Sequence, residues 1–315
     1  MKKVRVAVVG AGHMGRYHAQ KFAACEGAEL AAIVDADAAR AAAFPGVAFF
    51  HDYREVLDLV DAVVIAVPTD RHFPIARACI LRGRHVLIEK PIAATLAQAD
   101  ALIRLAKKQK VVLQVGHVER FNRGFAAISS RIDRPMYIET ERLAPFKSRG
   151  VEVDVVLDLM IHDLDLMVAL ARSEVKHVSA SGFRVLTRDI DIATANIEFA
   201  SGCVANLSAS RVSQAAVRKL RMFQHGVYLS ADLQSGAVRF ITQEGGEVRQ
   251  ADENYTGGDA LAEQAKSFVL AISRKKPAVV SGDDGRRALK LALDVGRLVR
   301  ERLKRFESSA RRKAG

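Results

Sequence analysis

Five ionisable side chains lie within an otherwise apolar stretch, residues 153–169. Apolar residues occupy most other positions of this stretch, which is typical of a helix enclosed by protein. Burying carboxylates and an imidazole there is costly unless each has a partner. Asp158 and His162 are four positions apart and share one helix face, where the carboxylate can orient the imidazole and tune its proton affinity. The spacing indicates an active-site acid–base pair, although a helix cap and a hydrogen-bonded core histidine would look the same.

The amino-terminal segment has the order of elements that a dinucleotide site requires. A β-branched run, Val4–Val9, leads into Gly10-Ala11-Gly12-His13-Met14-Gly15 and then into a helical pattern up to residue 24. We expect Gly10 to permit a tight turn, Gly12 to let a pyrophosphate approach the backbone, and Gly15 to allow close helix–strand packing. The helix N-terminus would face the phosphates, which makes residues 10–15 the expected cofactor loop.

A second expected strand, residues 30–34, ends at Asp35, twenty residues after Gly15. An acidic side chain at this place accepts hydrogen bonds from the adenosine ribose and repels a 2′-phosphate. The sequence therefore favours NAD over NADP, although Arg40 could favour the phosphorylated cofactor. The alternative, a glycine-rich turn with no ligand, fits the strand–helix–strand–Asp context less well.

Four further strands are expected at residues 48–50, 62–67, 85–89 and 111–115, alternating with helices. Six strands complete a doubly wound parallel sheet, the α/β Rossmann fold. Ligands bind just past the carboxyl ends of such strands, so the expected cofactor contacts there are Pro68, Thr69, His72, Glu89 and Lys90. Lys90 is also a candidate for proton transfer, since an oxidised nicotinamide and partial desolvation both lower a lysine pKa. An ordinary surface lysine at a strand end is the alternative.

These motifs together resemble the glucose-fructose oxidoreductase/inositol dehydrogenase family, Gfo/Idh/MocA. The resemblance rests on G-x-G-x-x-G, on Glu89-Lys90-Pro91, and on Asp158-x-x-x-His162 about seventy residues later, and it spans nearly the whole chain. It implies an NAD-dependent dehydrogenase acting on a CH–OH group, with Lys90 and His162 over the nicotinamide and Asp158 positioning the hydroxyl or the histidine. It also implies a second α+β domain built on a large, open, mostly antiparallel sheet.

Strand-like stretches in the second half of the chain suit that sheet, at residues 136–143, 175–185, 192–199, 204–210 and 221–233. We expect an NAD-binding domain over residues 1–118 and a substrate-binding and oligomerisation domain over residues 119–315, whose C-terminal helix packs back near the first. An open sheet with an apolar face needs covering, which predicts a homodimer or homotetramer. Members of the family often carry a glycine triplet before the Asp-x-x-x-His, where this chain has only Gly150.

Three segments resemble a narrower branch of the family, enzymes that oxidise the 3-hydroxyl of UDP-N-acetylglucosamine: residues 116–122, 155–163, and 201–207 with Ser210 and Arg211. The branch implies a nucleotide-sugar substrate and a downstream aminotransferase that makes the 3-amino sugar of lipid A, a part of lipopolysaccharide. Six cations near strand ends could grip the diphosphate, although each alone could be a solvated surface cation. They are Arg120, Arg123, Arg211, Arg218, Lys219 and Arg221. The expected substrate contacts are Lys90, Arg120, Asn122, Asp158, His162 and Arg211.

Composition sets the remaining limits. The 315 residues, half of them apolar, predict two domains. No apolar run reaches bilayer-spanning length and the start leads into a strand, so we expect a cytoplasmic protein without membrane insertion. Three dispersed cysteines predict no metal site and no disulfide. Of the net charge of +12, residues 286–315 contribute +8, from eleven Lys and Arg against three acidic residues, so the excess is local and does not indicate nucleic acid.

Several functions stay open at this point. The nearest rival is a dehydrogenase of the same fold that acts on a free sugar, a cyclitol or another nucleotide-sugar. A non-catalytic nucleotide sensor and a basic scaffold for anionic polymers are rivals of other classes, and strongly salt-dependent DNA binding would reveal the scaffold. The sequence does not decide which of Lys90 and His162 is the general base.

Overall fold

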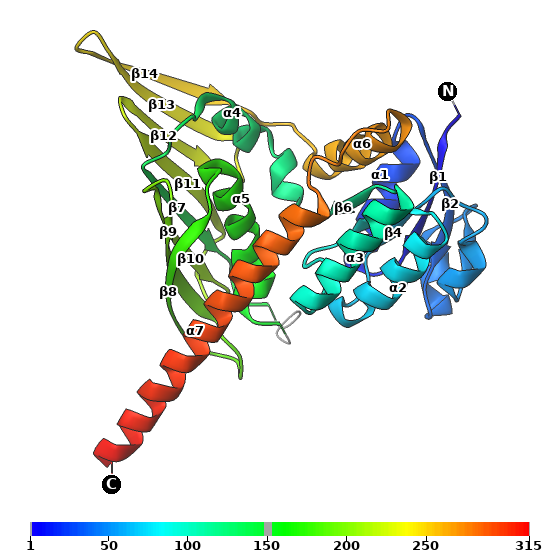
Figure 1. The fold of residues 1–315 in the computed structure, drawn as a ribbon, viewed down its shortest axis with the longest axis horizontal. Coiled ribbons are helices and arrows are strands. Elements are labelled where there is room, and N and C mark those ends of the chain that lie inside the picture. The colour runs from blue at the N-terminus through cyan, green and yellow to red at the C-terminus, as the bar shows by residue number, and fades with distance from the viewer. Residues whose placement is uncertain (1, 148–152, 315) are drawn as a thin grey trace. The chain divides into compact units, whose positions relative to one another are not determined.

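The computed structural model describes residues 2–147 and 153–314, with side chains up to residue 309. Gly150 and the loop around it lie outside the described residues. The chain divides into two compact units (Figure 1). The first unit is Met1–Phe121 with Asp259–Leu289, and the second unit is Asn122–Gly258 with Lys290–Gly315. The first division lies three residues past the boundary expected at residue 118, but Asp259–Leu289 belongs with the first unit rather than the second.

The first unit contains a six-stranded sheet in the order β3-β2-β1-β4-β5-β6, in which every strand pair is parallel. This order is the doubly wound arrangement expected from the sequence, and its direction reverses between β1 and β4. Its strands are β1 (Val4–Val9), β2 (Ala28–Val34), β3 (Ala48–Phe50), β4 (Ala62–Ile65), β5 (His85–Ile88) and β6 (Leu113–Val115). The expected bounds differ from these by at most two residues at any end. The carboxyl ends of all six strands meet at one edge, where the expected cofactor residues follow them.

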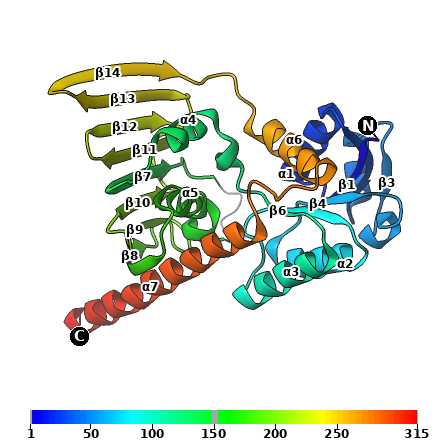
Figure 2. The ribbon, with the colours of Figure 1, turned by 45° about the horizontal axis from the view of Figure 1, so that its top comes forward.

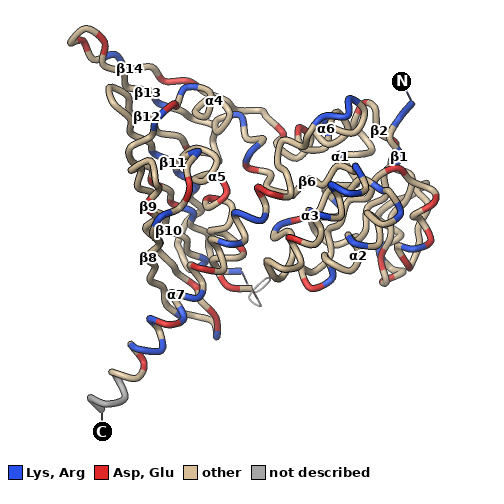
Figure 3. The backbone as a smooth tube through the Cα atoms, viewed as in Figure 1, with Lys and Arg blue, Asp and Glu red and all other residues tan. Residues whose placement is uncertain are grey.

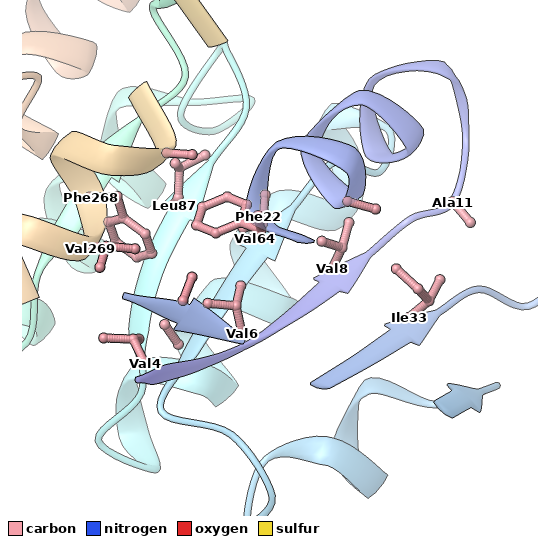
Figure 4. Close-up of a cluster of buried hydrophobic side chains, with 14 residues drawn as sticks. Val4, Val6, Val8, Ala11, Phe22, Ile33, Val64, Leu87, Phe268 and Val269 are labelled. Carbon is pink, nitrogen blue, oxygen red and sulfur yellow. The ribbon is translucent and has the colours of Figure 1, made fainter. Parts of the chain in front are cut away.

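Helices cover the sheet of the first unit: α1 (His13–Ala24), α2 (Thr69–Leu81), α3 (Leu96–Gln109) and α6 (Ala260–Ser273), with short 3-10 helices η1 (Ala38–Ala43), η2 (Tyr53–Val56) and η3 (Val118–Phe121). One hydrophobic core lies between β1, α1 and α6 (Figure 4). In it the ring edge of Phe22 in α1 meets Phe268 in α6 at a centroid distance of 6.3 Å. Since both rings are fully buried, α6 completes this core although it follows the whole second sheet in sequence.

The second unit contains an eight-stranded sheet in the order β14-β13-β12-β11-β7-β10-β9-β8 (Figure 2). Among the described strands of this sheet, only β7 and β10 pair in parallel, which confirms the expected, mostly antiparallel sheet. The strands are β7 (Tyr137–Leu143), β8 (Val175–Phe183), β9 (Ile192–Phe199), β10 (Val204–Ser210), β11 (Val217–Gln224), β12 (Val227–Asp232), β13 (Ala237–Glu244) and β14 (Glu247–Asn254).

The sequence interpretation was wrong in one region of this sheet. The single strand expected over residues 221–233 is two strands, β11 and β12, joined at Gly226, whose φ of +69° suits glycine. The hairpin of β13 and β14 was not predicted, and β14 has few apolar residues and is mostly exposed. Its signal was Gly245-Gly246, both with positive φ (60° and 88°), the residue pair that a tight hairpin turn favours.

Four helical segments belong wholly or partly to the second unit: α4 (Arg123–Arg131), the π-helical turn η4 (Val156–Met160), α5 (Ile161–Ala171) and α7 (Gly282–Ala314). Figures 1 and 2 both show α4 and α5 on the same face of the sheet. Burial alternates along β7, where Ile138, Thr140 and Arg142 are buried and the residues between them are not. Among the described residues of the second unit, no helix lies on the other face of the sheet, which is called here the uncovered face.

Helix α7 begins in the first unit and continues in the second. Charges of both signs follow its length (Figure 3), and ion pairs one turn apart join Lys290 to Asp294 at 2.8 Å and Arg297 to Glu301 at 3.0 Å. Such pairs stabilise an exposed helix face modestly. Among the described residues, no helix has both the length and the apolar character needed to cross a bilayer.

Candidate functional site

The glycine loop between β1 and α1 has no room for a side chain at Gly10 or Gly15. Gly10 has φ +95°, and a Cβ there would lie 2.5 Å from the Ala66 carbonyl oxygen. A Cβ on Gly15 would lie 1.7 Å from the Gly10 carbonyl oxygen, so the loop packs directly against α1. Gly12 is the N-cap of α1 and provides no side-chain cap. The first N–H groups of α1 are thus left for an anion such as a pyrophosphate.

The next two residues of the loop differ in exposure. His13 is exposed and its ring edge packs on Tyr17 at 4.9 Å, while Met14 is half-buried. Ala11 is buried and its N–H donates to Asp35 Oδ2 at 2.6 Å. This hydrogen bond ties the loop to the carboxyl end of β2.

Asp35 lies where the sequence predicts it, directly after β2. Its carboxylate accepts hydrogen bonds from Ala11 N–H and, at 2.9 Å, from Asp37 N–H. An ionised carboxylate offers about four acceptor positions, so about two remain for ribose hydroxyls. The Arg40 guanidinium lies 3.3 Å from Asp37 and 3.7 Å from Asp35. These two carboxylates offset the charge of Arg40, the cation that could otherwise favour a 2′-phosphate. The electrostatics of this corner therefore suit NAD.

His72, expected to contact the cofactor, lies inward. Only 1% of the residue is exposed, its Nδ1 lies 2.8 Å from the Pro91 carbonyl oxygen, and its Nε2 lies 2.9 Å from that of Val67. Burial is the largest influence on its pKa and lowers it, against the two carbonyl oxygens that favour the protonated ring. Pro68, the exposed N-cap of α2, and Thr69, its half-buried first residue, lie at the strand end as expected.

Glu89 also faces the interior of the first unit. Its Oε1 lies 2.7 Å from His18 Nε2 of α1, and its Oε2 accepts from the Lys90 backbone N–H at 3.2 Å. Burial by itself would raise the pKa of Glu89, but the His18 contact and the Lys90 charge outweigh it and hold the pKa below its usual range. Lys90 is half-buried at the end of β5 and is followed by a cis peptide bond to Pro91. His18 was not singled out from the sequence.

Asp158 and His162 lie on the helix that the apolar pattern predicted, but its geometry is different. Asp158 belongs to the π-helical turn η4, and His162 belongs to α5, which continues it. A π-helical turn widens the helix by one residue and is common at functional sites. Both side chains are half-buried, unlike their neighbours Met160 and Ile161, which are buried. Asp158 shares this partial burial with Leu157 and Leu159, so the two ionisable groups lie in the less buried part of the helix.

The start of this helix is held by three contacts within the second unit. Asp154 Oδ1 accepts from Leu157 N–H at 2.9 Å, and its Oδ2 lies 2.9 Å from Arg300 Nη1 of α7. Arg211 Nη2 donates to the Val153 carbonyl oxygen. Asp154 is thus a helix cap, whereas Asp158 lies within the helix.

An ion pair that the sequence did not reveal lies beside His162. Arg142 of β7 and Asp163 of α5 are both buried, and the guanidinium contacts the carboxylate through Nε at 3.1 Å and Nη2 at 2.8 Å. Breaking such a pair by removing one partner is costly, because the other charge stays buried. The signal was an arginine on the inward face of a strand together with an aspartate in an apolar helix.

Other expected substrate contacts, and one of the cations considered for the diphosphate, also have structural partners. Arg120 Nη2 lies 3.8 Å from Asp284 within the first unit. Asn122 caps α4 by accepting from Gly124 N–H at 2.9 Å, and its Nδ2 donates to the Leu233 carbonyl oxygen at 2.8 Å. Arg221 pairs with Glu139 at 2.8 Å across the sheet. Within the part of the chain that the structure describes, no three His, Cys, Asp or Glu side chains are grouped to hold a metal ion.

Comparison with known proteins assigns the family. The Gfo/Idh/MocA oxidoreductase family with its NAD-binding Rossmann fold matches residues 4–117, and the C-terminal domain of the same family matches residues 126–226. The two matches correspond to the Rossmann sheet and to the first strands of the large sheet. They also agree with the glycine loop and the Asp35 corner, which suit NAD.

Individual relatives match over almost the full chain. A UDP-N-acetylglucosamine 3-dehydrogenase of Acidithiobacillus ferrooxidans is 39% identical, over 94% of this chain and 97% of the relative. A solved structure of that enzyme has a TM-score of 0.91 at 38% identity and covers 95% of this chain and 98% of its own. A myo-inositol 2-dehydrogenase of Thermotoga maritima is 27% identical, over 95% of this chain and 97% of the relative. The expected family, fold class and cofactor are confirmed: the chain is an NAD-dependent dehydrogenase of the Gfo/Idh/MocA oxidoreductase family.

Proposed function

We propose that this dehydrogenase oxidises the 3-hydroxyl of UDP-N-acetylglucosamine to a ketone, with NAD⁺ as the hydride acceptor. The observation that carries the proposal is the similarity to UDP-N-acetylglucosamine 3-dehydrogenase, which extends through both units at 39% identity with a TM-score of 0.91 in the solved structure. Fold alone would not support a substrate, since one fold hosts many activities.

Three side chains are proposed to carry out the proton chemistry. His162 accepts the proton of the sugar hydroxyl, and Asp158, one helical turn earlier, orients the imidazole or the hydroxyl. The Lys90 ammonium donates a hydrogen bond to the same oxygen and stabilises its developing negative charge. The half-burial of all three residues supports these roles, because each is shielded yet reachable. In the alternative assignment Lys90 is the general base. The pH dependence of turnover in the single variants of His162 and Lys90 distinguishes the two assignments.

The proposed cofactor contacts follow the edge formed by the strand ends of the first unit. Residues 10–15 bind the pyrophosphate, Asp35 the adenosine ribose, and Pro68, Thr69 and Lys90 line the nicotinamide end. Glu89 and His72 support this edge from inside, because their polar atoms are directed to His18, Val67 and Pro91. For the substrate, Arg120, Asn122 and Arg211 stay predicted contacts. An arginine has five N–H donors, so a structural partner leaves others for a diphosphate.

We also propose that the uncovered face of the large sheet is an interface between copies of this chain, giving a homodimer or homotetramer. Aromatic rings from three neighbouring strands adjoin on this face, with Tyr137 5.7 Å from Phe223 and Phe223 4.9 Å from Tyr228. A symmetric assembly would cover them. Light scattering coupled to gel filtration tests this, and the Phe223→Arg variant should be a monomer. A wild-type monomer would contradict it.

The product chemistry suggests the setting of the reaction. A 3-keto nucleotide-sugar is a substrate for an aminotransferase, which would supply the 3-amino sugar used in lipid A and lipopolysaccharide. We place this reaction in the cytoplasm, the compartment that holds NAD and nucleotide-sugars.

The decisive experiment mixes the purified chain with NAD⁺ and UDP-N-acetylglucosamine and follows the absorbance of reduced nicotinamide. Parallel reactions contain UDP-glucose, N-acetylglucosamine, glucose or myo-inositol. Reduction that depends on both the uridine diphosphate and the acetamido sugar supports the proposal. Activity on free inositol or glucose, without activity on the nucleotide-sugar, would establish the rival function.

A further inference from the structure

Two buried histidines from different helices contact the residues on either side of Lys90. His18 belongs to α1 and His72 to α2, and each is 1% exposed. His18 contacts Glu89, the residue before Lys90, while His72 contacts Pro91, the residue after it. The lysine backbone is therefore held from both sides.

His72 connects two loops at the edge where the strand ends meet. Val67 lies two residues past β4, and Pro91 lies three residues past β5. The ring nitrogens lie 2.8 Å and 2.9 Å from the two carbonyl oxygens, so the neutral ring donates its one N–H to either of them and only the protonated ring donates to both. The spacing between the β4 loop and the β5 loop is thus set by one imidazole. Since both its nitrogens are directed at these carbonyl oxygens, His72 has no ring nitrogen directed at a cofactor.

Glu89 provides the second anchor. One carboxylate oxygen meets His18 at 2.7 Å and the other accepts from the Lys90 N–H at 3.2 Å. Gly116 lies close beside this carboxylate, where a side chain would not fit, because a Cβ on Gly116 would lie 2.9 Å from Glu89 Oε1. The carboxylate therefore has little freedom to turn, and it fixes the amide of the lysine.

We propose that His72 and the His18–Glu89 pair are positioning residues for Lys90: together they fix its backbone so that the ammonium reaches the reacting oxygen. This inference rests on the proposed function, in which Lys90 stabilises that oxygen. Misplacing a catalytic group by about 1 Å can cost about 10²-fold in rate, so a clamp on the backbone has a large effect at the side chain.

The test compares three variants. His72→Phe keeps an aromatic ring and removes both ring nitrogens, while His72→Gln restores an amide group whose N–H can donate to a carbonyl oxygen. His85→Phe is the matched control, because the His85 ring is likewise hydrogen-bonded to the backbone, here as the acceptor from Val112 N–H at 2.9 Å, but at the opposite end of β5. We expect His72→Phe to lower kcat by about 10-fold to 10²-fold, His72→Gln to recover most of it, and His85→Phe to stay within about twofold of wild type.

A double-mutant cycle then tests whether His72 affects kcat through Lys90. In a Lys90→Ala background, His72→Phe should have no further effect on kcat, because the group it positions is gone. A full additional loss in that background would overturn the proposal, as would an unchanged kcat in His72→Phe alone.

A second readout needs neither cofactor nor substrate. The rate at which acetic anhydride labels Lys90, followed by peptide mass spectrometry, should change about threefold or more in His72→Phe and in His18→Phe, but not in His85→Phe, with exposed lysines as internal standards. Unchanged labelling of Lys90 in the two variants would overturn the clamp. If the wild-type chain fails to oxidise UDP-N-acetylglucosamine, the proposed function fails, and the labelling result still decides the clamp.

Discussion

The guanidinium of Arg300 in α7 lies 2.9 Å from the carboxylate of Asp154, which caps the helix that carries Asp158 and His162. The carboxylate is 6% exposed and the guanidinium 45% exposed, so solvent screens the pair only from one side. A residue near the carboxyl end of the chain thus stabilises the start of the proposed catalytic helix.

Arg300→Met should therefore lower stability and also disturb catalysis. We expect a loss of about 1 kcal/mol, because the buried carboxylate keeps only its cap hydrogen bond, and a several-fold lower kcat. Arg297→Met, in the same helix and paired with the exposed Glu301, is the control; it should lower stability by less than about 0.5 kcal/mol and leave kcat unchanged. Urea unfolding and steady-state kinetics measure both. Equal behaviour of the two variants would contradict a role for the Arg300–Asp154 pair.

His162→Ala should lower turnover by about 10²-fold to 10⁴-fold, the usual scale for a positioned general base. His177→Ala removes an exposed imidazole from β8 of the same unit and should leave turnover unchanged. Initial rates at saturating NAD⁺ and substrate make the comparison. Wild-type turnover in His162→Ala would remove this imidazole from the mechanism.

Asp35→Asn should weaken the preference for NAD over NADP. The amide keeps an acceptor for Ala11 N–H but loses the negative charge that repels a 2′-phosphate, so the ratio of kcat/KM values should fall by about 10-fold. Asp37→Asn is the matched control, since Asp37 also lies near Arg40 but does not bond the glycine loop. An unchanged ratio in Asp35→Asn would mean that another group selects the cofactor.

Gly10→Ala should lose both stability and NAD⁺ affinity. Gly46 offers a control with a similar φ, +78° against +95°, but with open space around a Cβ. Gly46→Ala therefore reports only the backbone strain, about 1 kcal/mol, whereas Gly10→Ala adds a collision with the Ala66 carbonyl. Melting temperatures with and without NAD⁺ separate the two effects. A Gly10→Ala variant as stable as Gly46→Ala would show that the loop can relax.

Asp191 predicts a pH dependence of stability. Burial by itself would raise its pKa, but hydrogen bonds from Val185, Leu186 and Thr187 N–H, each at 2.8 Å, and from the Thr187 hydroxyl outweigh it and lower the pKa. A lowered pKa in the folded state stabilises the protein above the ordinary aspartate value, about 3.9, and this contribution is lost as pH falls through the lowered value.

Asp191→Asn should therefore cost about 1 to 3 kcal/mol near neutral pH, and the difference from wild type should shrink as pH falls below about 4. Urea midpoints measured over that range give the two curves. Parallel curves would show that the carboxylate does not stay ionised in the folded state.

The first sheet was predictable because its signals are local. Each strand is a short apolar run, and Gly10 and Asp35 follow strands at the spacing a nucleotide requires. The turn at Gly226 was missed because the residues on both sides of it continue the strand pattern, and β14 because its residues are mostly exposed. The local pattern thus missed β14, which buries no face, and also β13, although Val238 and Phe240 of β13 are buried.

The sequence identified the residues of the candidate site but not the side chains with which they interact. Asp158, His162 and Lys90 stand out from the residues around them, whereas the His18–Glu89 contact joins positions 71 residues apart and the Arg142–Asp163 pair joins a strand to a helix. His72 shows the same limit: its place after β4 is readable, but its inward direction depends on the Pro91 carbonyl, 19 residues later. Long-range pairing of buried polar groups leaves no periodic trace in a sequence.

The core of the first unit needs a helix that is synthesised after the entire large sheet. Phe268 and Val269 of α6 fill the space beside Phe22 and Val4 (Figure 4). On the ribosome, residues 1–121 emerge with that apolar surface still open, and they must wait for Asp259–Leu289 before they can close it. A fragment that stops at residue 121 should therefore aggregate, whereas a chain in which residues 1–121 are joined directly to residues 259–289 should fold and bind the dinucleotide.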